Sequence, residues 1–289
     1  MERALGAYHP LVSFTYFVVV IGTSMLCMHP IFVVISLISG TLYSFIINRE
    51  KTKQILKFSS LMIILITLAN VIFVNRGVTV LFYLRGNPIT LESFLYGILS
   101  GLMMACVIVW FSCYNEIVTS DKFLYIFGKT LPSIALMASM TLGLIPKLIN
   151  QTKVIASTQK TIGIDYEEGT IIKKIKSSMR ILSIVVTWAL EDAVQTADSM
   201  KARGYGIKGR TNFTIFIFIK RDIIMLGFIW IVAVFLGSAY SNGYCQLLFY
   251  PTIQSIRLDT LSTILYLSFF IITIIPIVLE LWEGYKWKY

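Results

Sequence analysis

Six runs of apolar residues decide what this 289-residue chain can fold into, because each is long enough to cross a lipid bilayer as a helix. A helix rises 1.5 Å per residue, so about 20 apolar residues span roughly 30 Å of hydrocarbon. The charged residues make up only 14% of the chain, which leaves most of its surface suited to lipid. The sequence therefore predicts an all-α integral membrane protein with about six transmembrane helices in a lipid bilayer. The runs cover approximately residues 11–28, 30–47, 58–75, 95–115, 223–241 and 262–282.

The chain has 25 Lys and Arg residues against 15 Asp and Glu, a net charge of +10, and the placement of the positive residues predicts which side of the membrane each connection faces. With the N-terminus inside, only Arg76, Arg85 and Arg257 fall in outer connections. The long central segment exceeds the reliable range of the positive-inside rule, but without it the inner side still holds 7 positive residues against 3. We therefore expect both termini and residues 119–222 to be cytoplasmic. The charge is then a topology signal, and no nucleic-acid partner is expected.

Three regions follow from this topology. Residues 1–118 hold the N-terminal transmembrane helices, about four in number. Residues 119–222 form a cytoplasmic region of helices, and residues 223–289 hold about two further transmembrane helices.

A further apolar run, Leu131–Ile149, is interrupted by polar residues and by Gly143 and Pro146. If this run crossed the membrane, twelve positive residues from Lys153 to Arg221 would move to the outer side. A helix that lies at the interface or packs on protein explains the mixed composition better. We favour that interpretation, and the spanning alternative stays open.

Residues 171–203 carry the pattern of one long amphipathic helix. Apolar residues recur every three or four positions, which is the spacing of a single helix face. About 33 residues would make a rod of roughly 50 Å, yet its apolar centre, Ile181–Leu190, is only about half a membrane thick. We expect a cytoplasmic rod whose apolar stripe needs a partner surface. The stripe consists of Ile175, Met179, Leu182, Val186, Leu190, Ala193, Ala197 and Met200.

The end of this rod has the features of a defined helix tip. Gly204 is placed to take the left-handed conformation that closes a helix. Arg203 lies in the last turn, where a cation is favoured by the helix dipole. Its guanidinium can bind a carboxylate of another subunit through two parallel hydrogen bonds.

A short segment similar in sequence to this tip, which we call the echo, lies 41 residues earlier. Residues 156–165 align with residues 197–206, and Gly163 then corresponds to Gly204. The echo suggests two helices that finish in similar tips, one for each half of a two-part partner.

The segment Leu190–Thr211, which reads LEDAVQTADSMKARGYGIKGRT, closely resembles the signature of the transmembrane T component of energy-coupling factor (ECF) transporters. The related cobalt and nickel uptake subunits share this signature, and the order of parts along the chain is similar. The resemblance implies a non-catalytic subunit in the plasma membrane of a bacterium or archaeon. Its implied partners are two ABC-type ATPases, identical or paired, and a small substrate-binding membrane protein, the S component, for uptake of a vitamin or a metal ion.

In that family, each of two coupling helices ends in an Ala-Arg-Gly motif that binds an ATPase. The second motif is intact here, whereas Ile162 stands in the place of the first arginine. Either Lys160 partly substitutes for that arginine or Ile162 docks in an apolar groove, so we expect unequal contacts with the two ATPases. The positions that the resemblance assigns to coupling are Ala202, Arg203 and Gly204 in the second motif and Lys160, Thr161, Ile162 and Gly163 in the first.

The residues themselves predict no catalytic or metal site and no cofactor. No Gly-Lys-Ser/Thr loop that cradles phosphate occurs in the sequence, so the energy of ATP is expected to come from partner subunits. No cysteine spacing matches a zinc site, and we interpret the cysteines as small apolar residues. They are Cys27, Cys106, Cys113 and Cys245.

Two alternative functions stay open. A self-contained secondary transporter would show polar or broken helices in repeated halves, and the arrangement of four spans plus two shows no such symmetry. A membrane-embedded lipid or prenyl transferase would need an acidic metal-binding motif, for which only Asp165, Glu167 and Glu168 offer a starting point. Copurification separates these classes, because only the T component needs two ATPase chains and a small membrane protein.

Overall fold

A computed structural model describes residues 4–74, 77–84, 87–128, 130–163, 170–207, 216–250 and 259–286. The chain divides into two compact units. Met1–Phe123 together with Phe216–Tyr289 form the first, which we call the helical bundle. Leu124–Ile215 form the second, which we call the helix pair.

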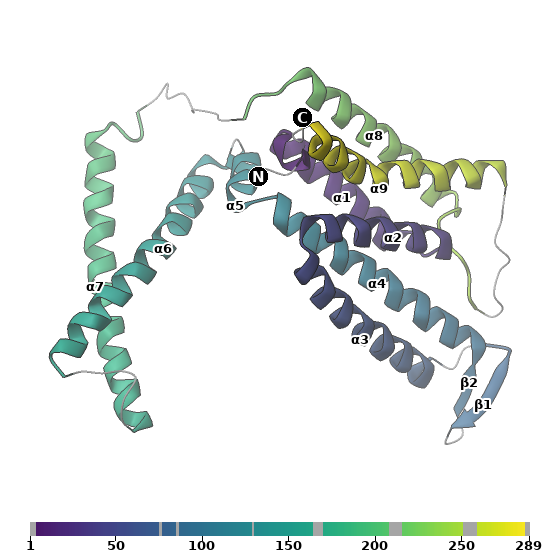
Figure 1. Ribbon diagram of the computed structural model, residues 1–289, viewed down its shortest axis with the longest axis horizontal. Helices are drawn as coiled ribbons and strands as arrows, with labels where there is room; N and C mark the ends of the chain where they lie inside the picture. Colours follow the sequence, from purple (N-terminus) through teal and green to yellow (C-terminus); the bar gives the residue numbers. More distant parts are fainter. Residues whose placement is uncertain are drawn as a thin grey trace. The chain divides into compact units, whose positions relative to one another are not determined.

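Long helices build the bundle, and a short hairpin is inserted between two of them (Figure 1). A single turn of 3-10 helix, η1, precedes the first long helix, and α5 leads from the bundle into the helix pair. The elements are η1 (Ala4–Ala7), α1 (Pro10–Leu26), α2 (Pro30–Ile47), α3 (Arg49–Phe73), β1 (Val80–Leu84), β2 (Asn87–Thr90), α4 (Leu91–Ile117), α5 (Ser120–Gly128), α8 (Lys220–Ser241) and α9 (Thr260–Lys286).

All six predicted spans form helices, and the prediction of an all-α membrane protein is confirmed. In the described part of the chain, six helices are long and apolar enough to cross a membrane: α2, α3, α4, α8, α9 and α6 (Pro132–Thr161). This set is not the predicted one. It includes α6, which contains the apolar run 131–149, and it omits α1, whose 17 residues make a shorter apolar helix.

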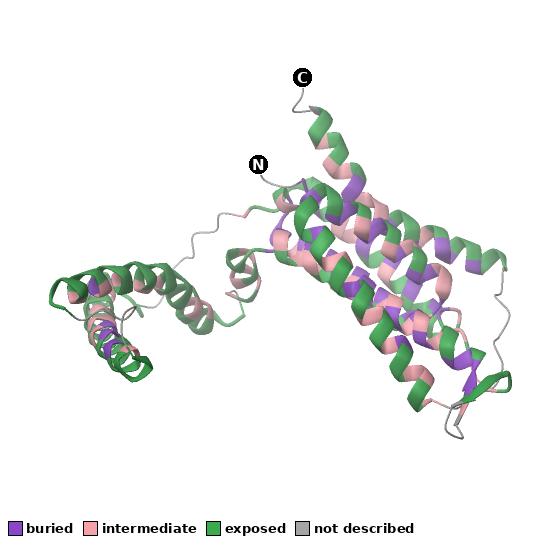
Figure 2. Ribbon diagram, turned by 60° about the horizontal axis from the view of Figure 1, so that its bottom comes forward, coloured by how far each residue is buried: buried purple, intermediate pink, exposed green. Residues whose placement is uncertain are grey.

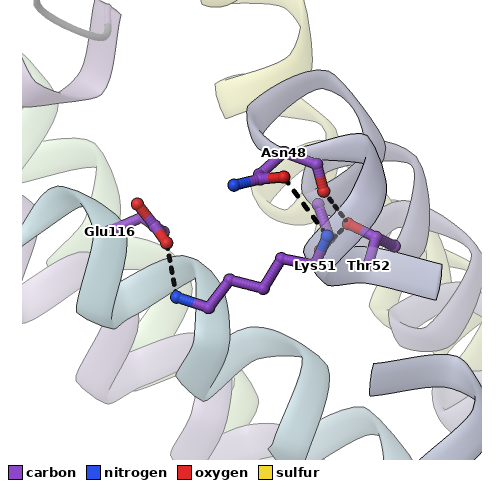
Figure 3. A network of polar contacts seen from close by, with 5 residues as sticks. Asn48, Lys51, Thr52 and Glu116 are labelled. Atoms are coloured by element: carbon purple, nitrogen blue, oxygen red, sulfur yellow. Dashed lines mark hydrogen bonds and ion pairs between the residues drawn. The ribbon is translucent and has the colours of Figure 1, made fainter. Parts of the chain in front are cut away.

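Local signals explain where several helices begin. Proline occupies the first position of both α1 and α2, where its missing N–H costs nothing. The side chain of Asn48 caps α3 by accepting a hydrogen bond from the backbone N–H of Lys51 at 3.2 Å (Figure 3). Because of this cap, α3 begins at Arg49, nine residues before the apolar run at 58, and its first turns carry charged residues.

The core of the bundle is aromatic. Trp110 of α4 is fully buried, and the rings of Tyr16, Phe17 and Tyr43 lie 6.3 to 6.4 Å from it. The indole N–H of Trp110 donates to Ser36 Oγ at 3.0 Å. This bond satisfies the buried donor and joins α4 to α2 at the centre of the bundle.

The hairpin of β1 and β2 was not predicted from the sequence. The strands pair antiparallel, with Val80 opposite Thr90, directly before α4. The signal was present, since residues 79–84 are rich in β-branched and aromatic residues and a Gly-Asn-Pro sequence follows. The two strands have only five and four residues, far fewer than the apolar runs that predict transmembrane helices.

The N-terminal residues are tied to one end of the bundle, at the opposite end from the hairpin (Figure 1). Lys122 Nζ donates to the carbonyl oxygen of Gly6 at 2.8 Å, and Arg221 donates to that of Ala7 at 3.3 Å. The N–H of Ala4 donates to the carboxylate of Glu280 at 3.0 Å. The first turn of α5, the start of α8 and the last turns of α9 therefore meet around η1.

Candidate functional site

The helix pair consists of α6 (Pro132–Thr161) and α7 (Ile171–Ala202), which cross each other (Figure 1). The long helix predicted for residues 171–203 coincides with α7. At the crossing, Ile155 of α6 is buried against Ile181 and Val185 of α7. Lys147, earlier in α6 than Ile155, contacts Asp192, which lies later in α7 than Val185, so the two helices run in opposite directions.

The predicted apolar stripe of α7 is not the face that packs on α6. The packing face instead contains Ser177, Ile181 and Val185, the residues of α7 that are buried. Figure 2 shows that both helices are otherwise mainly exposed. The helix pair therefore leaves most of the stripe uncovered. Its large members, with 48 to 65% of each residue exposed, are Ile175, Met179, Leu182, Val186 and Leu190.

An ion pair joins the two helices beside this apolar contact. Lys147 Nζ lies 2.5 Å from Asp192 Oδ1 and 5.4 Å from the centre of the Trp188 ring. The cation therefore binds a carboxylate and an aromatic face that lie one helical turn apart on α7. Sequence reasoning missed this contact because 45 positions separate Lys147 from Asp192, and no local pattern pairs them.

A groove of about 440 Å³ runs beside the crossing, and its walls are mainly apolar. Thr152, Lys153 and Ala156 line it from α6, whereas Met179 and Leu182 line it from α7. The groove thus borders the uncovered stripe of α7.

The end of α7 is a complete Schellman motif. Gly204 has φ +80°, in the left-handed region, and its N–H donates to the carbonyl oxygen of Lys201 at 3.0 Å. The N–H of Tyr205 donates to the carbonyl oxygen of Met200 at 3.0 Å. These are the two bonds that define this helix ending, and they satisfy carbonyls that the last turn would leave free.

The end of α6 shares the left-handed glycine and the first of these two bonds. Gly163 has φ +83°, and its N–H donates to the carbonyl oxygen of Lys160 at 3.1 Å. Ile162 is the C-cap of α6 with φ −97° and ψ 18°, and Arg203 is the C-cap of α7 with φ −81° and ψ 7°. The two similar segments thus end in helix termini that share a left-handed glycine, its hydrogen bond and the C-cap conformation, with isoleucine at the C-cap of one and arginine at the C-cap of the other.

The side chains at the two tips differ in chemistry. Arg203 is exposed and, with Asp192 and Ser199, lines a polar hollow of about 330 Å³ on the last turns of α7. Ile162 has 65% of its surface exposed, although it is an apolar residue. Ala202 and Thr161, which precede them, are also exposed. At the C-cap position, one tip therefore carries a cation and the other an apolar side chain, although the exposed Lys160 also lies in the last turn of α6.

The acidic residues raised as a possible metal motif, Asp165, Glu167 and Glu168, lie outside the described residues. Among the residues that are described, no three His, Cys, Asp or Glu side chains are grouped closely enough to hold a metal ion.

Large apolar side chains cover the outer surface of the bundle, as α3 shows. A bundle of long apolar helices that leaves such side chains uncovered by protein defines a multi-pass integral membrane protein. On α3, the exposed apolar side chains are Phe58, Leu61, Ile64, Leu65, Leu68 and Ile72.

Comparison with known proteins identifies the family. The family model described as CbiQ, cobalt transport protein, matches residues 8–215 of this chain. The chain therefore belongs to the CbiQ family of transport proteins, which includes the T components of ECF transporters.

Individual relatives agree with this assignment. The ECF transporter transmembrane protein EcfT of Lactobacillus helveticus is 35% identical over 108 residues, which cover 37% of this chain and 39% of the relative. EcfT of Streptococcus thermophilus is 36% identical over 106 residues, covering 36% and 40%. The chain thus spans about two fifths of the length of these two relatives. EcfT of Brevibacillus brevis is 27% identical over 256 residues, covering 81% of this chain and 95% of the relative.

Proposed function

We propose that this chain is the coupling and scaffold subunit of an ECF-type importer and that α6 and α7 are its two coupling helices. Two ABC-type ATPases bind the tips at Ile162 and Arg203, and an S component in the membrane captures the substrate. The motion of the ATPases passes through the helix pair to the S component and drives uptake of a vitamin or a metal ion.

The observation that carries the proposal is the shared structure of the two tips. One helix closed by a left-handed glycine is common in any protein. Here two helices of one crossing end in this way, at Gly163 and Gly204. They run in opposite directions, so their tips project from opposite ends of the crossing. This arrangement offers two similar docking points to two similar ATPases.

The helix pair is also suited to transmit force. A hydrogen-bonded helix is stiff along its axis; α7 contains 32 residues, and in the 30-residue α6 the interior Pro146 lies before the crossing, outside the stretch that leads to the tip. The buried contact of Ile155 with Val185 and the ion pair of Lys147 with Asp192 join them at the crossing. A displacement imposed on one tip therefore moves the crossing instead of bending the rod.

The two ATPase contacts are unequal in this proposal. Arg203 binds a carboxylate of one ATPase through two parallel hydrogen bonds, which fix both distance and orientation. Ile162 instead docks in an apolar groove of the other ATPase, where burial of its exposed side chain is favourable.

We also propose that both termini and the helix pair face the cytoplasm, that α6 does not span the membrane, and that the membrane is the plasma membrane of a bacterium or archaeon. The positive residues of the sequence support this orientation. So do the hydrogen bonds that bring Lys122 and Arg221 to the N-terminal residues at one end of the bundle.

Replacing Arg203 tests the proposal directly. The Arg203→Ala variant should copurify with far less ATPase than the wild type in mild detergent. Removal of one partner of a desolvated ion pair costs about 3–5 kcal/mol, which corresponds to binding more than about a hundredfold weaker. The measurement is the ratio of ATPase to T component in the purified complex.

Lys173→Ala provides the matched control, because Lys173 is an exposed cation of α7 distant from the tip. It should leave the ratio unchanged. An unchanged ratio in Arg203→Ala would contradict the role of this tip. A wild-type preparation without any ATPase chain would instead favour a self-contained transporter.

A further inference from the structure

Two of the four buried cysteines meet at the end of the bundle that carries the hairpin. Cys27 is the C-cap of α1, and Cys245 lies in the segment after α8. They are 2% and 0% exposed and belong to the same core cluster. The two thiols share a hydrogen bond.

The backbone holds these two segments side by side. The N–H of Leu247 donates to the carbonyl oxygen of Met28 at 3.2 Å. Backbone segments joined by such hydrogen bonds lie about 5 Å apart. A disulfide requires the Cα atoms of its two cysteines to be separated by about 4.4–6.8 Å. The spacing of the two segments therefore suits a disulfide.

We propose that Cys27 and Cys245 form a disulfide that ties the turn between α1 and α2 to the connection between α8 and α9. The other two cysteines do not form such a pair. Cys106 and Cys113 lie seven residues apart on α4, about 10 Å along the helix, and the thiol of Cys106 donates to the carbonyl oxygen of Val33. They act as internal controls.

The chemistry requires an oxidant. Each Sγ–H loses a proton and an electron, the Sγ–Sγ bond forms, and the two electrons reduce the disulfide of a thiol oxidoreductase to two thiols. Both thiols are buried in the packed core, where an oxidoreductase cannot reach them. Exchange therefore precedes docking of the segment after α8, and the packed core then shields the bond from reductants.

The inference rests on the orientation given under Proposed function, and it is independent of the coupling role. With the termini inside, the hairpin end faces the outside, where disulfides persist. Reducing conditions on that side would keep both thiols free.

Thiol counting tests the inference. Membranes are quenched in acid, unfolded, and treated with a maleimide-polyethylene glycol reagent before and after reduction. Two of the four cysteines of the wild type should react before reduction and all four afterwards. In Cys27→Ser the three remaining cysteines should all react without reduction. In Cys106→Ser one cysteine should react before reduction and three afterwards.

A stability measurement accompanies the count. Reduction should lower the melting temperature of the wild type in detergent by roughly 5 °C or more and leave that of Cys27→Ser unchanged. Reaction of all four wild-type cysteines before reduction would overturn the inference. Copurification of ATPases, measured on the same preparations, is expected to be equal in the wild type and Cys27→Ser. A failure of the disulfide is thus distinguishable from a failure of the coupling role.

Discussion

Single glycine residues allow α3 and α4 to approach backbone to backbone. A Cβ atom on Gly97 would lie 3.0 Å from Thr67 Cα, and one on Gly101 would lie 3.0 Å from Ile63 Cα. Small residues four positions apart are a common way for membrane helices to pack closely. The hydroxyl of Ser93, on the same helix, donates to the carbonyl oxygen of Val74 at 2.7 Å and thereby fastens the end of this contact.

Gly101→Val should destabilise the bundle by about 1–3 kcal/mol, because the new side chain would collide with the backbone of α3. Gly22→Val is the matched control, since a Cβ atom on Gly22 meets nothing within 4 Å. Thermal unfolding in detergent should show a lower midpoint for the first variant only. Equal midpoints would mean that the close approach of α3 and α4 contributes little to stability.

At the scale of elements, the crossing of α6 and α7 combines a small apolar contact with one ion pair. Both Lys147 and Asp192 are partly exposed, with 52% and 23% of their side chains accessible. Water therefore screens their attraction, and we expect a coupling of about 0.5–1 kcal/mol rather than the value of a buried pair.

Reversing both charges tests the contribution of this pair. Lys147→Asp and Asp192→Lys should each increase hydrogen exchange in α6 and α7 near the crossing, because each variant places like charges together. The double variant should restore most of the protection. If the double variant instead lost as much protection from hydrogen exchange as the two single variants together, the two side chains would act independently.

Local features of these elements were predictable from the sequence, whereas their contacts were not. Pro30 and the apolar run after it predicted α2 with the bounds that the structure shows. Gly204 predicted the left-handed end of α7, because φ above zero is costly for other residues. The face of α7 that meets α6 was not predicted, since a periodic apolar stripe does not show which neighbouring residues pack on another helix. The ion pair of Lys147 depends on a crossing that the sequence does not encode locally.

In the candidate site, too, the local features were predictable from the sequence and the contacts between helices were not. The two similar helix tips and the difference between them follow from the residues at 162 and 203 and the similarity of the two segments, whereas the coupling role is implied by the family resemblance. That both tips project from one crossing depends on tertiary packing. The roles of these residues in binding ATPases stay predictions.

At the scale of the whole molecule, the account requires one end of the bundle to face the cytoplasm. Tyr83 of the hairpin is 71% exposed at one end, and Ser199 is exposed near the tip of α7. The native cysteines are buried, so a cysteine introduced at either position should dominate labelling in intact cells.

A membrane-impermeant maleimide should label Tyr83→Cys in intact cells, and it should label Ser199→Cys only after the membrane is permeabilised. The unsubstituted chain serves as the background control. Labelling of Ser199→Cys in intact cells would reverse the proposed orientation and place the helix pair outside.

The most direct test of the central claim is photo-crosslinking from the tip of α7 in native membranes. A photoreactive amino acid at position 201 leaves Arg203 intact and replaces Lys201, an exposed residue of the last turn. The account predicts a crosslinked product that contains an ABC-type ATPase subunit. Crosslinks to lipid alone, or to no nucleotide-hydrolysing protein, would contradict it.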